Sequence, residues 1–211
     1  MEELIKLVKL VKNISKKPEV KRVVDLRIRE FRSKRTESAD DIFKELCFCI
    51  LTANFNAERS IKIQEEIGDG FLRMTEKQIA KKLKDLGHRF PNTRAKYIVE
   101  ARKRKNLIRK ILNQRNEQEI REWLVKNIKG IGYKEASHFL RNMGFENVAI
   151  IDFHIIDLLT KFGLIKKPKT LGKKKYLEIE KILKKLSEKL NISPAGLDLY
   201  LWYVETGKIL K

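Results

Sequence analysis

Apolar residues recur three and four positions apart along nearly the whole chain, and this spacing restricts the fold more than any other feature. Such a period places the apolar side chains on one face of an α-helix. The one β-branched cluster, residues 148–151, is short and runs directly into another helical pattern, so we expect a buried connector there. Glycine, proline and asparagine separate the helical stretches, and we therefore predict an all-α fold with about nine or ten helices. The pattern is clearest in three runs: Leu4, Leu7, Val8 and Val11; Ile42, Leu46, Cys49 and Ile50; and Ile179, Ile182, Leu183 and Leu186.

The chain carries 48 Lys and Arg against 28 Asp and Glu, which gives a formal net charge of +20. A surface with this excess attracts polyanions and speeds their capture. Enrichment in lysine and glutamate is also typical of heat-adapted proteins, where it says nothing about a partner. Nucleic acid is nevertheless the partner that this charge favours.

No stretch of the chain is suited to crossing a membrane. The longest apolar runs, around Ile50 and at residues 149–151, fall well short of the roughly 20 residues that span a bilayer. Charged residues interrupt the apolar positions near the N-terminus, which does not resemble a signal peptide. We expect a soluble intracellular protein of the cytoplasm or nucleoid.

The cysteines and histidines do not form a metal-binding pattern. Cys47 and Cys49 are the only cysteines, so neither a disulfide framework nor a four-cysteine zinc or iron–sulfur site can be assembled. His88, His138 and His154 lack the spacing of a zinc site, and we expect them to pack or to contact phosphate. We predict no cofactor and no metal ligated by side chains. A cation held by backbone carbonyls of a hairpin remains an open alternative.

Residues 123–144 read as a helix, the five residues Ile-Lys-Gly-Ile-Gly, and a second helix. Gly130 and Gly132 permit a tight turn, so that backbone N–H groups at the positive end of the second helix can meet a phosphate. Such a contact anchors a DNA strand without reading its bases. Glycine also ends helices in ordinary connectors, so the hairpin alone leaves DNA binding undecided.

Lys134 lies two residues after Gly132, and Asp152 follows 18 positions later. Taken singly, each has an ordinary structural role, since lysine is common in a solvated first helical turn and aspartate is a favoured N-cap. Together, the runs Ile-Lys-Gly-Ile-Gly-Tyr-Lys-Glu-Ala and Ile-Ile-Asp-Phe-His-Ile resemble the helix-hairpin-helix DNA glycosylases. The similarity is greatest to the archaeal-type (type 2) 8-oxoguanine DNA glycosylases, in length, in the lack of iron–sulfur cysteines and in the C-terminal run that ends at Lys211. It covers roughly residues 42–211.

The resemblance implies roles for several residues of this chain. Lys134 and Asp152 match the catalytic lysine and aspartate of the family. Asn54 and Arg59 fall in the segment that probes the duplex and fills the space left by an extruded base. Phe90, in the turn Arg-Phe-Pro, is a further candidate, because a flat apolar ring can wedge between bases.

The resemblance also implies a site for the damaged base at the C-terminal end of the chain. Trp202 corresponds to an aromatic platform, and Lys211 to a C-terminal lysine that contacts the base. Trp202 could equally be a core residue of the last helix, together with Tyr200 and Tyr203. Ile209 and Leu210 can bury and hold Lys211 in place.

These residue types suit excision of a base. The enzyme must first rotate the nucleotide out of the duplex. A deprotonated lysine amine can then attack C1′, and an ionised carboxylate can stabilise the cationic sugar as the base departs. Loss of a C2′ proton from the resulting Schiff base would eliminate the 3′ phosphate and nick the strand.

We therefore predict two helical lobes with an active-site cleft between them. A barrel-like domain, residues 30–143, would end in the hairpin at about 123–143, and residues 1–29 with 144–211 would form the second domain. The predicted protein is a monomer that acts on double-stranded DNA as an 8-oxoguanine DNA glycosylase and AP lyase. The alternatives are a glycosylase/lyase for oxidised pyrimidines, a non-catalytic helix-hairpin-helix DNA-binding module and a basic RNA-binding protein.

Overall fold

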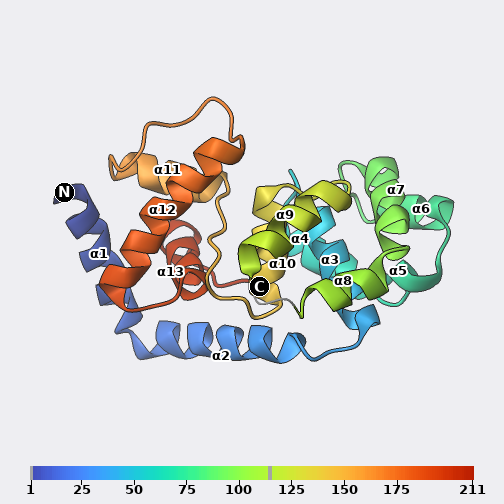
Figure 1. Ribbon diagram of the computed structural model, residues 1–211, viewed down its shortest axis with the longest axis horizontal. Coiled ribbons are helices and arrows are strands. Elements are labelled where there is room, and N and C mark those ends of the chain that lie inside the picture. Colours follow the sequence, from blue (N-terminus) through green and yellow to red (C-terminus); the bar gives the residue numbers. More distant parts are fainter. Residues whose placement is uncertain (1, 114–115) are drawn as a thin grey trace. The chain divides into compact units, whose positions relative to one another are not determined.

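The computed structural model describes residues 2–113 and 116–211 (Figure 1). Within them there are 13 helices and no strand, so the predicted all-α fold is confirmed and the predicted number of helices was too low. Helices such as α5 (Gly70–Arg73) and α8 (Lys105–Ile111) are too short for a helical period to be visible in the sequence. No described helix is long and apolar enough to cross a membrane. Contacts divide the chain into two units, Ser33–Met143 and the residues up to Arg32 together with Gly144–Lys211.

The unit Ser33–Met143 is built around α3 (Ala39–Thr52). Every residue of α3 from position 42 to position 52 is buried except Lys44. A helix that is buried on all sides needs neighbours all round. They are α4 (Ala57–Ile67), α5, α7 (Pro91–Arg102), α8 and α10 (Tyr133–Asn142), while α6 (Glu76–Asp85) packs on α7 and α9 (Glu117–Asn127) packs on α10.

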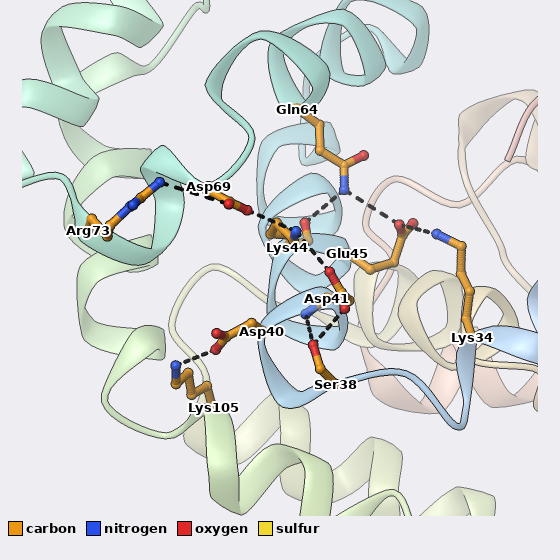
Figure 2. A network of polar contacts seen from close by, with 10 residues as sticks. All are labelled: Lys34, Ser38, Asp40, Asp41, Lys44, Glu45, Gln64, Asp69, Arg73 and Lys105. Atoms are coloured by element: carbon orange, nitrogen blue, oxygen red, sulfur yellow. Dashed lines mark hydrogen bonds and ion pairs between the residues drawn. The ribbon is translucent and has the colours of Figure 1, made fainter.

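Polar contacts gather along the first half of α3 (Figure 2). The most deeply buried of the residues labelled there is Glu45, whose side chain is 2% exposed. Oε2 of Glu45 lies 2.9 Å from Nζ of Lys34, and Oε1 accepts a hydrogen bond of 2.6 Å from Nδ2 of Asn142. A buried carboxylate destabilises a fold unless it is paired, so these partners are needed where they stand. Glu45 therefore fastens α3 to α10.

The other unit combines the two ends of the chain. It contains α1 (Glu2–Ser15), most of α2 (Pro18–Lys34), α11 (Phe153–Lys161), α12 (Lys173–Leu190) and α13 (Pro194–Thr206). The buried face of α1, with Leu7, Val11 and Ile14, belongs to a helix that packs on α12 and α13 (Figure 1). The N-terminal helix is thus covered by helices encoded more than 150 residues later.

Candidate active site

The predicted hairpin connects α9 to α10 through residues 128–132. Gly130 has a φ of +82°, in the left-handed region, and a Cβ there would lie 2.4 Å from the ring of Tyr97. Gly132 is the N-cap of α10 and has an ordinary φ of −96°. Its N–H donates a hydrogen bond of 3.1 Å to Oε2 of Glu135, and a Cβ at Gly132 would lie 3.1 Å from that same oxygen. The two glycines therefore meet different needs, backbone conformation at Gly130 and room beside Glu135 at Gly132.

Lys134 occupies the second position of α10, directly after the hairpin. Its side chain is 22% exposed, and its Nζ lies 3.9 Å from Oε1 of Glu135. Glu135 thus accepts the hairpin N–H with one oxygen and faces the amine with the other. The positive end of the helix dipole lies at the same place. The amine of Lys134 accordingly stands beside the backbone N–H groups expected to hold a phosphate.

Polar contacts join α9 to residues of α10 on either side of Lys134. Arg121 of α9 is 2% exposed, and its Nη1 donates a hydrogen bond of 3.1 Å to Oγ of Ser137 in α10. The guanidinium of Arg121 also lies 5.5 Å from the ring centroid of Tyr133. Tyr133 in turn donates from its hydroxyl to Oε1 of Glu122 at 2.5 Å. These contacts cross-link α9 to the first two turns of α10.

Asp152 is the N-cap of α11. Its Oδ1 accepts a hydrogen bond of 3.0 Å from the N–H of Ile155, and its carbonyl accepts the N–H of Ile156 at 3.0 Å. The structural role that the sequence offered for this residue is therefore real. It uses one carboxylate oxygen, and Oδ2 makes no hydrogen bond to any residue in the described part of the chain. The N-cap thus leaves half of the carboxylate for other partners.

Residues of α12 hold the connector that leads into Asp152. The connector residues 148–151 are buried and form no strand, as predicted. The hydroxyl of Tyr176 donates to the carbonyl of Ala149 at 2.7 Å and accepts the N–H of Ile151 at 3.3 Å. Oε1 of Glu180 accepts the N–H of Ala149 at 3.2 Å. Neither Tyr176 nor Glu180 lies in a recognisable motif, so the sequence did not single them out.

A row of aromatic rings follows Asp152. Phe153 is 66% exposed, its ring centroid lies 4.2 Å from that of His154, and His154 meets Trp202 edge to face at 4.7 Å. Trp202 is only partly buried, and its buried Nε1 makes no hydrogen bond to a described residue. Lys211 is half-buried at the end of the chain. His154 thus packs between two aromatic rings, in line with the packing role expected from the sequence, and Phe153 is a neighbour that the sequence did not single out.

The expected duplex-probing residues lie in two connections. Asn54 is exposed and has a φ of +56° in the α3–α4 loop, residues 53–56. Arg59, in the first turn of α4, is exposed and donates to the α6–α7 turn, residues 86–90. Phe90 ends that turn as the N-cap of α7.

The candidate residues fall into two groups, one in each unit. Ser33–Met143 carries Asn54, Arg59, Phe90, the hairpin glycines and Lys134. The other unit carries Asp152, Trp202 and Lys211. The role of Glu135 at the hairpin could have been found in the sequence, because glutamate three residues after an N-cap is a recognised helix-start signal.

The chain matches the sequence model of a known protein family. The sequence model of the family described as 8-oxoguanine DNA glycosylase matches residues 24–192. The chain belongs to the 8-oxoguanine DNA glycosylase family. This confirms the resemblance drawn from the hairpin and from the positions of Lys134 and Asp152.

Relatives of this family member cover nearly the whole chain. The 8-oxoguanine DNA glycosylase/AP lyase of Methanocaldococcus jannaschii is 54% identical over 209 residues, which are 99% of each chain. That of Korarchaeum cryptofilum is also 54% identical, over 91% of this chain and 92% of its own. The similarity therefore does not begin near residue 42, as the motifs suggested, but includes the N-terminal helices.

Solved structures agree with the family assignment. The M. jannaschii 8-oxoguanine glycosylase/lyase, crystallised in complex with a 15mer DNA containing 8-oxoguanine, matches with a TM-score of 0.95 and 52% identity, over 98% of this chain and all of the other. The Thermotoga maritima 8-oxoguanine DNA glycosylase matches with a TM-score of 0.93 and 44% identity, over 99% of this chain and all of the other.

Proposed function

We propose that this protein excises 8-oxoguanine from double-stranded DNA and cleaves the strand at the abasic site that results. The proposal rests on one observation above all: relatives at 54% identity along almost the full chain are 8-oxoguanine DNA glycosylase/AP lyases. The hairpin with Lys134 at its exit and the half-occupied carboxylate of Asp152 supply the groups that such a reaction needs. The protein is thus a bifunctional base-excision repair enzyme.

Lys134 is the proposed nucleophile. Its deprotonated Nζ attacks C1′, the bond between C1′ and the base breaks, and the electron pair leaves with the base, which takes up a proton. The attacking nitrogen loses a proton, the C1′–O4′ bond breaks with O4′ taking up a proton, and the nitrogen and C1′ are left joined as a Schiff base. Loss of a proton from C2′ moves an electron pair toward C3′ and expels the 3′ phosphate, so that the strand is nicked.

Asp152 is the proposed electrostatic partner of this step. Positive charge develops on the sugar as the base departs, and an ionised carboxylate facing the sugar stabilises that charge. Oδ2 is the oxygen that the N-cap leaves for this purpose. We propose that Lys134 and Asp152 act on one sugar, in the active-site cleft that the sequence predicts.

The other candidate residues contact the extruded base, the gap that it leaves or the phosphate backbone. We propose that Trp202 stacks on the extruded base and that Lys211 contacts its edge, beside the aromatic row. Asn54, Arg59 and Phe90 would occupy the gap in the duplex, and the hairpin at Gly130 and Gly132 would anchor the phosphate backbone. No step of this scheme requires a cofactor.

The first experiment is borohydride trapping on a duplex that contains one 8-oxoguanine. We expect the native chain to form a covalent protein–DNA adduct, and Lys134→Gln to form none. Lys126→Gln, which changes an exposed lysine of α9, is the matched control and should trap normally. An adduct with abasic DNA but none with 8-oxoguanine would contradict the substrate, and no adduct with either would contradict the lyase mechanism.

A further inference from the structure

The last carbonyls of α3 are bound by side chains from the α6–α7 turn and from α7. A helix leaves its final carbonyls without backbone partners, and its C-terminal end is electronegative. Nε2 of His88 lies 3.1 Å from the carbonyl oxygen of Leu51, and Nη2 of Arg94 donates to that of Ala53 at 2.5 Å. The cationic group of Arg94 thus lies at the negative end of α3. The two bonds thus hold the carbonyls of Leu51 and Ala53, at the end of α3 and the start of the α3–α4 loop.

The α6–α7 turn is in turn bound by a side chain of α4. Nη2 of Arg59, from α4, donates to the carbonyl of Gly87 at 2.9 Å. Gly87 has a φ of +73°, and a Cβ on it would lie 2.4 Å from that same nitrogen, so glycine is required for this approach. The N–H of Phe90 donates to Nδ1 of His88 at 3.0 Å. His88 therefore links its own turn to the end of α3.

The hydrogen bonds at His88 define its tautomer. The N–H of Phe90 can only donate, so Nδ1 must accept, whereas the carbonyl of Leu51 can only accept, so Nε2 must carry the hydrogen. One neutral imidazole satisfies both neighbours. The ring also packs against Phe55 with a centroid separation of 4.2 Å, and the guanidinium of Arg59 lies 5.1 Å from the Phe55 ring centroid.

The side chains that bind these carbonyls are buried, whereas Asn54 in the α3–α4 loop is exposed. His88 and Arg94 are 4% and 7% exposed. Asn54, the residue after Ala53, is exposed and left-handed, a conformation that most L-residues rarely adopt and that asparagine adopts more readily than the others. Such a conformation persists when the surrounding structure over-determines it. His88, in the α6–α7 turn, and Arg94, in α7, are two buried donors that can restrain the loop in this way.

We propose that His88 and Arg94 are positioning residues that form a carbonyl clamp, defined as their bonds to Leu51 and Ala53. The clamp sets the α3–α4 loop and the α6–α7 turn in one arrangement before DNA binds. Asn54 and Phe90 are thereby presented together to the duplex, and less ordering remains when a base is extruded. This inference rests on the proposed gap-filling role of Asn54 and Phe90.

The test compares two activities of the same protein. One is the single-turnover rate of 8-oxoguanine excision from a duplex, and the other is the nicking rate on a duplex with a preformed abasic site, where no base has to be unstacked. We expect Arg94→Met to lower excision on the order of 10- to 100-fold relative to nicking, because small misplacements have effects of that size. His88→Phe keeps the ring and removes both bonds, and it should change the ratio in the same direction.

The matched control is Arg102→Met. Arg102 is also an arginine of α7, and it donates to two carbonyls of α5 and its C-cap, those of Phe71 at 2.7 Å and Met74 at 2.8 Å, which belong to neither probing loop. Its loss should leave the ratio of excision to nicking unchanged. A fluorescent 2-aminopurine beside the lesion should report slower base extrusion in the clamp variants alone.

Asn54→Ala separates this inference from the function on which it rests. If Asn54→Ala lowers the ratio of excision to nicking while Arg94→Met and His88→Phe do not, the clamp is overturned and the gap-filling role stands. If Asn54→Ala and both clamp variants leave the ratio unchanged, the gap-filling role is wrong and the clamp falls with it. If Arg94→Met does not fold, the ratio of excision to nicking in His88→Phe tests the clamp in its place.

Discussion

The carboxylate of Asp152 has two oxygens, and among the described residues only Oδ1 has a hydrogen-bond donor. An N-cap and a catalytic group are usually treated as competing explanations of an aspartate. Here they are compatible, because capping α11 orients the carboxylate and consumes one of its acceptors. Tyr176 and Glu180 hold the connector that leads to it. A substitution can therefore separate the capping role of Asp152 from its proposed electrostatic role in the reaction.

Asp152→Asn should keep the cap and lose the charge, since asparagine caps a helix about as well as aspartate. We expect thermal stability close to that of the native protein and an excision rate lower by about 10²- to 10³-fold, the size of a lost electrostatic contact in a transition state. Melting temperature and single-turnover excision measure the two effects. Ser193→Ala, which removes the cap of α13, should cost roughly 1 kcal/mol and spare the rate. Native activity in Asp152→Asn would refute the catalytic role.

His88 gives the fold a dependence on pH. Burial lowers the pKa of His88 from its ordinary value of 6.5, and the nearby charges of Arg94 and Arg59 lower it further, against an opposing hydrogen bond to the carbonyl of Leu51. Protonation would also place a second N–H against the N–H of Phe90. As pH falls below about 6.5, the unfolded chain binds the proton first, so stability that is present above this value is lost.

We therefore expect the native protein to lose stability between pH 7.5 and pH 5 more steeply than His88→Gln, whose side chain does not titrate. The difference in melting temperature between the two proteins should be largest at the upper end and shrink toward the lower end. Thermal unfolding across this range measures it. Parallel curves would mean that His88 titrates alike in the folded and unfolded chains.

At the scale of elements, the hairpin between α9 and α10 depends on backbone conformation. Gly130 is left-handed and closely approached by Tyr97, Glu135 caps the start of α10, and Arg121 ties α9 to α10. The hairpin is thus a rigid connection whose N–H groups are oriented before DNA arrives. A change in its backbone should weaken phosphate binding without removing any side chain of the reaction.

Gly130→Ala should cost roughly 1–2 kcal/mol of stability through the left-handed φ, and more if Tyr97 cannot move. We expect affinity for undamaged duplex to fall by about tenfold, which corresponds to ~1.4 kcal/mol. Fluorescence anisotropy with labelled duplex measures this affinity. The control is Gly172→Ala at the N-cap of α12, where nothing lies within 4 Å of an added Cβ. Equal affinities for the two variants would argue against the hairpin as an anchor.

At the scale of the whole molecule, the net charge of +20 acts on any nucleic acid regardless of sequence or damage. Binding through phosphates releases condensed counterions, so affinity falls with salt. Specificity for a lesion must come from elsewhere, namely from base extrusion and the recognition residues. Charge and recognition should therefore respond differently to ionic strength.

We expect the dissociation constant for undamaged duplex to rise by about 10³- to 10⁵-fold between 50 and 200 mM salt if six to ten phosphates are contacted. The ratio of affinities for 8-oxoguanine duplex and undamaged duplex should change far less over the same range. Titrations at four salt concentrations with both duplexes measure the two slopes. A flat dependence would show that the positive surface does not track the backbone.

Local properties of the sequence were sufficient to predict the fold class and the family. Helical periodicity indicates the all-α fold, glycine marks the hairpin, and the residues around Lys134 and Asp152 resemble the family to which the chain belongs. Each of these signals depends on neighbours within one or two helical turns. Short helices such as α5 escaped detection because they contain too few residues to show a period.

The tertiary structure alone decided which distant residues meet. The bonds from His88 to Leu51, from Arg94 to Ala53 and from Tyr176 to the connector join positions 25 to 41 residues apart. The packing of α1 on α12 and α13 joins opposite ends of the chain. Periodicity reveals which face of a helix is buried but not what covers it, because that choice depends on the complementary shape and polarity of elements remote in sequence.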